Sequence, residues 1–305
     1  MGASDAENRF RVLVVALHSG ATMPPDSIEE QMLRGIHATH DTNLLELACA
    51  YASEIIQSRN TSDKAVARRL FEALSARGNH LAMFNLAISL VQGDGGHMDI
   101  KRSADLFEKL VFADDVPDAL RAEARNSLAQ CYHSARGRLR DMDKALLFWE
   151  QAADGGVVEA AFNVGIFYDE LPGVFKASSP DFAKASKYYR KAAKAGHVHA
   201  ATNLGLLLYK HHEHEESALE GMQWLEFAAG KGDWSAQEFL RHMKNQADLF
   251  LRDLDAGRID PIRLRSIQQD LVKSFRTREV TGVANKELAK PRARGSRANR
   301  SAKNK

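Results

Sequence analysis

Small, apolar and polar positions recur along the chain in one ordered pattern. A small residue is followed three positions later by Asn or a substitute, then by an aliphatic residue, and then by Ala or Gly. Successive copies start 36 to 42 residues apart. The clearest copies are Ala82 to Ala87, Ala124 to Ala129, Ala160 to Gly165 and Ala200 to Gly205, with looser copies at 43–48 and 236–240. Self-similarity at this period predicts a helix-turn-helix unit repeated along the chain.

A second pattern follows the first in each copy. An Asp is followed by a small residue, an aromatic residue, an Ala pair and a closing Gly, as in Asp141 to Gly156 and Asp181 to Gly196. We expect the Asp to cap a helix N-terminus and the Gly to take the left-handed conformation at the C-terminus. The small residues let helices approach closely, and aromatic residues such as Trp149 fill the space between layers. Because one such hairpin cannot bury its apolar face alone, consecutive hairpins should stack.

The string Ala160-Ala-Phe-Asn-Val-Gly-Ile-Phe-Tyr168, followed by Lys184 to Gly196, resembles the Sel1-like repeat, a relative of the tetratricopeptide repeat. The resemblance covers about residues 43–245. It implies an all-α fold: a right-handed α-solenoid of about five helix-turn-helix repeats with flanking capping helices and a disordered basic C-terminal tail. Phe84 and Phe162 match packing positions of the repeat, so we expect both in the core.

Four segments follow from these patterns: an N-terminal segment with a short capping helix at 1–42, the repeat solenoid at 43–245, C-terminal capping helices at 246–280 and a disordered basic tail at 281–305. The capping box Ser27-Ile-Glu-Glu30 predicts the start of the first capping helix. The stretch Arg9–Leu17 contains valines that favour a strand, but the all-α context favours a helix. Apolar spacing predicts one helix at 236–254 and, after Asp260-Pro261, another at 264–275.

The formal net charge of +2 is unevenly distributed along the chain. Residues 286–305 hold one acid, Glu287, and eight basic residues: Lys286, Lys290, Arg292, Arg294, Arg297, Arg300, Lys303 and Lys305. The tail therefore carries +7 and the other 285 residues carry −5. Such a tail can neutralise phosphates or contact an anionic lipid or protein surface, and a solubilising disordered end explains the same composition.

Cys49 and Cys131 are the only cysteines in the sequence. Two cysteines are too few for a disulfide framework, so we expect two buried thiols in a reducing compartment. The apolar stretch Val12–Leu17 is too short for a signal peptide, and no apolar run is long enough to span a bilayer. A cytoplasmic protein without a transmembrane segment is therefore expected.

The sequence lacks the motifs of phosphate-binding loops, dinucleotide-binding folds, serine hydrolases and zinc proteases. We therefore predict no catalytic residues, no cofactor and no enzyme activity. The weak candidates for a metal site are His211, His212 and His214, because imidazoles alternate there with carboxylates. A solvated polar loop explains the same residues, since the acids precede the next helix N-terminus. We predict no metal site.

The resemblance implies a non-catalytic scaffold or adaptor that binds a peptide or protein in a concave groove lined by the first helices of the repeats. The exposed positions expected on that wall are Arg125, His133, Asp169, Thr202 and Tyr209. Two alternatives remain open. The basic tail could anchor the protein on nucleic acid or an anionic membrane, in which case salt or removal of the tail would abolish binding. An enzyme with an unrecognised site would instead contain a deep pocket with convergent polar groups.

Overall fold

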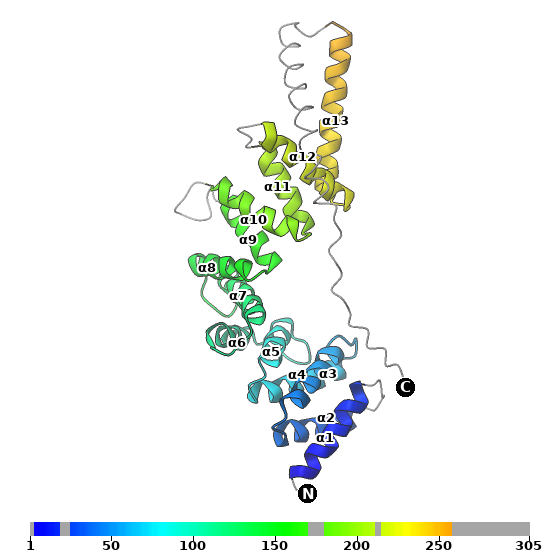
Figure 1. Ribbon diagram of the computed structural model, residues 1–305, viewed down its shortest axis with the longest axis vertical. Helices are drawn as coiled ribbons and strands as arrows, with labels where there is room; N and C mark the ends of the chain where they lie inside the picture. The colour runs from blue at the N-terminus through cyan, green and yellow to red at the C-terminus, as the bar shows by residue number, and fades with distance from the viewer. Residues whose placement is uncertain (1–2, 19–24, 170–179, 211–214, 258–305) are drawn as a thin grey trace, which may run out of the picture. The chain divides into compact units, whose positions relative to one another are not determined.

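The computed structural model describes residues 3–18, 25–169, 180–210 and 215–257. Within these ranges the regular elements are thirteen α-helices, and no strand occurs (Figure 1). The all-α prediction is therefore confirmed. The chain divides into two compact units, residues 1–179 and residues 180–305.

Nine described helices belong to the first unit, and each packs mainly on its neighbours in the sequence. They are α1 (Ala3–His18), α2 (Pro25–Ala38), α3 (Thr42–Ile55), α4 (Thr61–Ala76), α5 (His80–Gln92), α6 (Ile100–Phe112), α7 (Asp118–His133), α8 (Met142–Asp154) and α9 (Val158–Asp169). The pairs α3/α4, α5/α6 and α7/α8 are helix hairpins, so α3, α5 and α7 are the first helices of three successive hairpins. This order matches the predicted helix-turn-helix repeats.

The helix ends follow the predicted capping chemistry. The side chain of Asp141 accepts a hydrogen bond from Lys144 N at 3.0 Å, and Asp181 accepts one from Lys184 N at 2.9 Å. Each of these bonds satisfies a backbone donor that has no partner within its own helix. Gly156 has a φ of +94°, which is the left-handed conformation expected at a helix C-terminus. The recurring Asp and Gly therefore mark the start and the end of the second helix of a hairpin.

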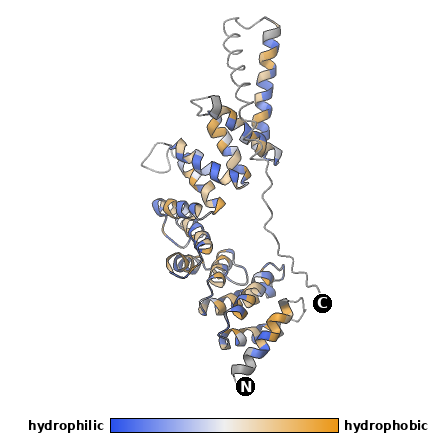
Figure 2. Ribbon diagram, in the orientation of Figure 1, coloured by the Kyte–Doolittle hydropathy of each residue, from blue (hydrophilic) through white to orange (hydrophobic). Residues whose placement is uncertain are grey.

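The core consists of the small and aromatic residues that recur in the sequence. Ala82, Ala124 and Ala145 are fully buried, and the ring of Phe107 is 1% exposed. Hydrophobic and hydrophilic residues alternate along the described helices, which is the pattern of half-buried helices (Figure 2). Burial of each large apolar side chain contributes about 2 kcal/mol to folding. Phe84 is only half-buried and packs edge-on against Phe107, so its predicted place in the core is confirmed only in part.

Ion pairs join side chains about one hairpin apart. Arg102 Nη1 lies 2.9 Å from Glu72 Oε1, and Arg138 Nη2 lies 2.6 Å from Glu108 Oε2. The two partners are 30 residues apart in both pairs. Because most of these side chains are substantially exposed, each pair contributes at most about 1 kcal/mol. The apolar layers therefore hold the hairpins together, and the ion pairs add little.

The second unit contains α10 (Phe182–Lys194), α11 (Val198–Lys210), α12 (Glu215–Gly230) and α13 (Trp234–Asp255). Helices α11 and α12 approach each other most closely at two glycines. A Cβ atom added to Gly205 would lie 2.7 Å from the backbone oxygen of Gly221, so no larger residue fits. Helix α13 is continuous from Trp234 to Asp255, in agreement with the helix predicted at 236–254, and it spans the predicted division between residues 245 and 246.

Several predictions concern the ends of the chain and the cysteines. Arg9–Leu17 lies within α1, as the all-α context predicted. Ser27 is not the N-cap, because α2 already begins at Pro25. Cys49 and Cys131 are both buried free thiols. The helix predicted at 264–275 and the basic tail lie outside the described residues, and none of the described helices is long and apolar enough to cross a membrane.

Candidate functional site

A hollow of about 440 Å³ opens in the first unit where the N-terminal ends of α3, α5 and α7 meet. We call it the Leu81 hollow. Most of its surface is apolar, and it is lined by Thr42, Leu45, Glu46, Cys49, Arg77, Gly78, Asn79, His80, Leu81, Pro117 and Leu120. All three helices are the first helices of their hairpins, so successive repeats build this site together.

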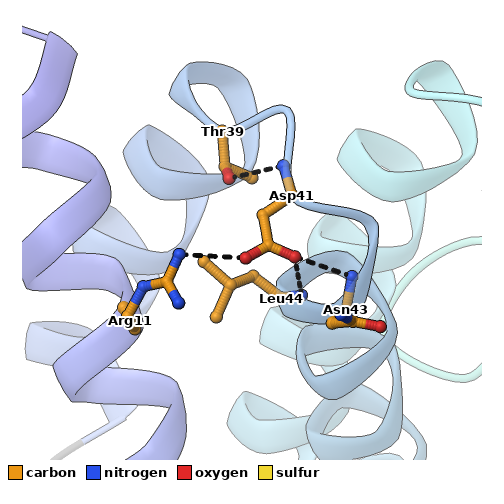
Figure 3. Close-up of polar contacts among 5 residues, drawn as sticks. All are labelled: Arg11, Thr39, Asp41, Asn43 and Leu44. Atoms are coloured by element: carbon orange, nitrogen blue, oxygen red, sulfur yellow. Dashed lines mark hydrogen bonds and ion pairs between the residues drawn. The ribbon is translucent and has the colours of Figure 1, made fainter.

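Asp41 fixes the start of α3 and thereby one wall of the hollow (Figure 3). Its Oδ1 accepts hydrogen bonds from Asn43 N at 3.0 Å and Leu44 N at 3.4 Å. Its Oδ2 accepts a hydrogen bond from Arg11 Nη2 of α1 at 2.9 Å, and Asp41 N donates to Thr39 Oγ1 at 3.0 Å. One carboxylate therefore caps α3 and ties it to α1, and the next turn of α3 presents its side chains to the hollow.

The turn between α4 and α5 forms the opposite wall. Asn79 is the N-cap of α5, and its Oδ1 accepts a hydrogen bond from Ala82 N at 2.8 Å. Arg77 Nη2 donates to Thr39 O at 2.6 Å, so the turn is also held to the segment that precedes α3. These bonds set the direction of the first turn of α5, which carries His80 and Leu81.

The chemistry of the Leu81 hollow is that of apolar contact. Leu81 is 49% exposed and lines the hollow. His80 Nε2 lies 3.5 Å from Asp115 Oδ1 at the rim. Burial raises the pKa of the Cys49 thiol to about 11, so it stays protonated at neutral pH and is a poor nucleophile. The hollow is therefore suited to receive an apolar side chain.

At the corresponding place in the second unit, a polar contact joins the starts of α11 and α13, and we call it the closed contact; the His199 side chain itself is 75% exposed. His199, in the first turn of α11, has its Nδ1 2.9 Å from Oδ2 of Asp233, the residue before α13. Asp233 is buried, and its Oδ1 accepts a hydrogen bond from Ala236 N at 2.9 Å. Burial acts to raise the pKa of Asp233, but hydrogen bonds from Ala236 N, Thr202 and His199 outweigh it and hold the pKa below its usual value.

Three of the five predicted wall residues lie in the first unit, but none of them lines the Leu81 hollow. Arg125 is half-buried on α7, with its Nε buried and without a hydrogen-bond partner. His133 packs against Trp149 with ring centroids 5.2 Å apart, and burial together with Arg140 lowers its pKa. Asp169 is half-buried at the end of α9. The structure therefore does not gather these three residues into one site.

The other two predicted wall residues lie in the second unit. Thr202 is 4% exposed and its Oγ1 lies 3.3 Å from Val198 O, so its assignment as an exposed residue is wrong. The reason is its place on α11, which directs the side chain towards Asp233 rather than solvent. Tyr209 is half-buried and packs edge-on against Phe239 of α13 at 5.2 Å. It therefore supports α13.

The apolar residues of the Leu81 hollow were not predicted from the sequence, because only polar and aromatic side chains were expected on the binding wall. The available signal was Leu81 itself. It precedes the small residue that starts a copy of the repeat pattern, at a position where the pattern requires no apolar residue. The candidates His211, His212 and His214 lie outside the described residues, as does the basic tail. Among the residues that are described, no three His, Cys, Asp or Glu side chains are placed to hold a metal ion.

Helix hairpins that pack on their sequence neighbours define the class of α-helical repeat proteins, and the chain has this architecture. The model of the Sel1 repeat matches residues 80–110, 122–157, 158–197 and 198–233. The chain therefore contains four consecutive Sel1 repeats, and the predicted resemblance is confirmed. Sel1 repeats generally serve as scaffolds for protein–protein interaction.

One solved structure supports the fold, and a second is reported for its similarity. A Sel1 repeat protein from Oxalobacter formigenes is 17% identical, with a TM-score of 0.52, and the match covers 75% of this chain and 88% of that one. A protective antigen of uropathogenic Escherichia coli strains with the same type of fold is 19% identical, with a TM-score of 0.39, over 78% of this chain and 56% of that one. A search of curated proteins gave no match.

Proposed function

We propose that the protein is a non-catalytic scaffold that binds a protein partner through the Leu81 hollow. The observation that supports this function is a half-exposed leucine in a hollow shared by the first helices of three successive hairpins. Apolar side chains from separate rigid helices form a preorganised surface, and an apolar anchor buried in such a hollow is a common centre of a protein interface.

The volume and lining of the hollow suit an apolar anchor of the partner. About 440 Å³ is enough to receive one or two large side chains. Burial of a leucine or phenylalanine there contributes about 2 kcal/mol. Glu46 and Arg77 both line the hollow, so it offers no excess of positive charge to attract a polyanion such as nucleic acid.

Two other predictions are kept as part of this proposal. Enzyme activity is not expected, because most of the surface of the Leu81 hollow is apolar and its thiol is protonated at neutral pH. A cytoplasmic location is inferred from the two unpaired, buried cysteines. The alternative of a nucleic-acid or membrane anchor rests on the basic tail.

Affinity purification with three forms of the chain tests the proposal. The full chain, a 1–285 truncation and Leu81→Asp would each be used as bait in lysate, washed with high salt, and analysed by quantitative mass spectrometry. We expect one partner that the full chain and the truncation retain and that Leu81→Asp loses. Partners that are lost on truncation and unaffected by Leu81→Asp would contradict the proposal and favour the tail.

A further inference from the structure

A second hollow lies beside the Leu81 hollow in the first unit. It has a volume of about 260 Å³, and we call it the Gln57 hollow. It is lined by Ser53, Ile56, Gln57, Lys64, Phe71, Asn85, Ile88, Ser89, Gln92 and Asp94, so its surface is mainly polar. These residues come from the last turn of α3 and the turn that follows it, from α4, and from α5 and the turn that follows it.

The two hollows lie along one seam between α3 and α5. On α3, the residues that line them follow helical spacing along a single face: Thr42, Leu45, Glu46, Cys49 and Ser53; Ile56 and Gln57 follow in the turn after the helix. On α5, Leu81, Asn85, Ile88 and Gln92 do the same. Asn85 Nδ2 donates to Ser53 Oγ at 2.9 Å and joins the two helices between the hollows. The seam therefore has an apolar end and a polar end.

The polar end presents neutral amide groups. Lys64 Nζ lies 2.7 Å from Asp94 Oδ1, and the buried Ser89 donates to Asp94 O at 2.6 Å, so these groups are already paired. Gln57 and Gln92 are exposed at the mouth. A side-chain amide has one acceptor and two donors, which match the alternating C=O and N–H groups of an extended peptide.

The charges along the seam also favour a peptide over a polyanion. Glu46 and Arg77 line the apolar end, and Lys64 and Asp94 line the polar end. Acids and bases are therefore balanced in each hollow, so a nucleic acid or an anionic lipid would meet carboxylates at both ends. A partner segment of low net charge has no such repulsion.

We propose that this seam binds an extended peptide segment of low net charge, with an apolar side chain in the Leu81 hollow and polar groups at Gln57 and Gln92. From Leu45 to the end of α3 at Ile55 the helix rises about 15 Å, and Gln57 follows in the next turn, so an extended chain spans the seam with about five residues. The inference rests on the proposed function and adds the second contact, the polarity of the segment and its length.

The probe is a phage-displayed library of random peptides about eight residues long, selected on the full chain. We expect the recovered sequences to pair a Leu, Ile, Phe or Met with an Asn, Gln, Ser or Thr about four to six residues away. A representative peptide is then synthesised, labelled and titrated by fluorescence anisotropy.

Variants of the full chain locate the two contacts. We expect Leu81→Asp to weaken peptide binding about 100-fold, and Gln57→Ala/Gln92→Ala to weaken it about fivefold. Gln246→Ala on α13 is the matched control for an exposed amide, and it should leave the affinity within about twofold. Because Gln57, Gln92 and Gln246 are all exposed, these variants should fold, as circular dichroism and urea unfolding would verify.

The outcomes separate the inference from the proposed function. If Leu81→Asp abolishes binding and the double glutamine variant leaves it unchanged, the hollow binds a partner but the seam does not, and the inference is wrong. If neither change affects binding, or if no peptide sequence is enriched, the inference about the seam and the proposed function are both wrong. Enrichment of strongly acidic or strongly basic peptides would overturn the argument from balanced charge.

Discussion

Two equivalent positions, one in each unit, carry residues of opposite character. Asn79 Oδ1 accepts a hydrogen bond from Ala82 N, and His197 Nδ1 accepts one from Ala200 N, so both residues precede and cap a first helix. Two residues after the cap, the first unit has Leu81 and the second has His199.

Leu81 faces an apolar hollow, whereas His199 contacts a buried carboxylate at the start of the next first helix. The same backbone site can therefore either join the starts of two first helices by a polar contact, which we call the closed position, or leave them unjoined, which we call the open position. A repeat scaffold can thus acquire a binding site through single side chains, with no change of fold.

The largest expected effect comes from charging the open position. Leu81→Asp places a carboxylate in the apolar hollow, and we expect partner affinity to fall about 100-fold, or about 2.7 kcal/mol. The measurement is titration with the partner recovered by affinity purification. His199→Ala, at the equivalent position of the second unit, is the matched control and should leave affinity unchanged. Equal losses in the two variants would refute the distinction between open and closed positions.

The next effect concerns stability at the closed position. Asp233 is 8% exposed and caps α13, so Asp233→Ala removes an N-cap and leaves buried donors without their acceptor. We expect a loss of about 2 kcal/mol in the free energy of unfolding. Asn79→Ala removes only a partly exposed cap, and we expect a loss of about 1 kcal/mol in the free energy of unfolding. Urea unfolding of both variants measures the difference, and a larger loss for Asn79→Ala would show that burial of Asp233 adds nothing.

A graft of the closed contact into the first unit makes the comparison sharper. Pro117 directly precedes α7, as Asp233 directly precedes α13. Only Asp233 caps its helix with a side-chain hydrogen bond. The double change Leu81→His/Pro117→Asp therefore introduces both partners of the His–Asp contact. We expect partner affinity to fall about tenfold, because the new pair fills the hollow, with the free energy of unfolding unchanged or raised by up to about 1 kcal/mol.

The two single changes are the controls for the graft. Pro117→Asp alone should supply the missing cap and leave most of the affinity intact, and Leu81→His alone should give an intermediate loss. Should the double variant bind as tightly as the wild type, occupation of the hollow by the partner would be excluded.

Much of the fold could be predicted from the sequence, because residues with the same structural role recur in every repeat. Buried alanines such as Ala82 and Ala124, and caps such as Asp141, recur with the period of the hairpin. The start of α2 was misplaced because Ser27 and Glu30 resemble a capping box inside a helix that begins earlier.

The candidate site was much harder to predict. The Leu81 hollow combines residues from α3, α5 and α7, and no local pattern shows that Leu81 and Leu120 line one cavity. The prediction that Thr202 is exposed was wrong for a related reason. Its polarity suggested exposure, but its hydroxyl contacts the carboxylate of Asp233, 31 positions further along the chain. Which polar groups are buried depends on contacts between hairpins, and the spacing within one hairpin does not show them.

The smallest expected effect is the dependence of the closed contact on pH. Asp233 has a lowered pKa in the folded protein, so its ionised form stabilises the fold. That contribution is fully present above the pKa of an unfolded aspartate, about 3.9, and is lost as the pH falls through the lower folded value. Asp233→Asn keeps a capping side chain but cannot ionise.

The wild type should therefore be more stable than Asp233→Asn at about pH 6, and the difference should shrink as the pH approaches about 3. Urea unfolding of both proteins across this range isolates Asp233, because every other carboxylate titrates in both. His199→Ala should reduce the difference at about pH 6, since it removes one of the hydrogen bonds that favour the carboxylate. A difference that grows towards acid would mean that the closed contact stabilises the neutral acid, and the polar closure of this junction would need another explanation.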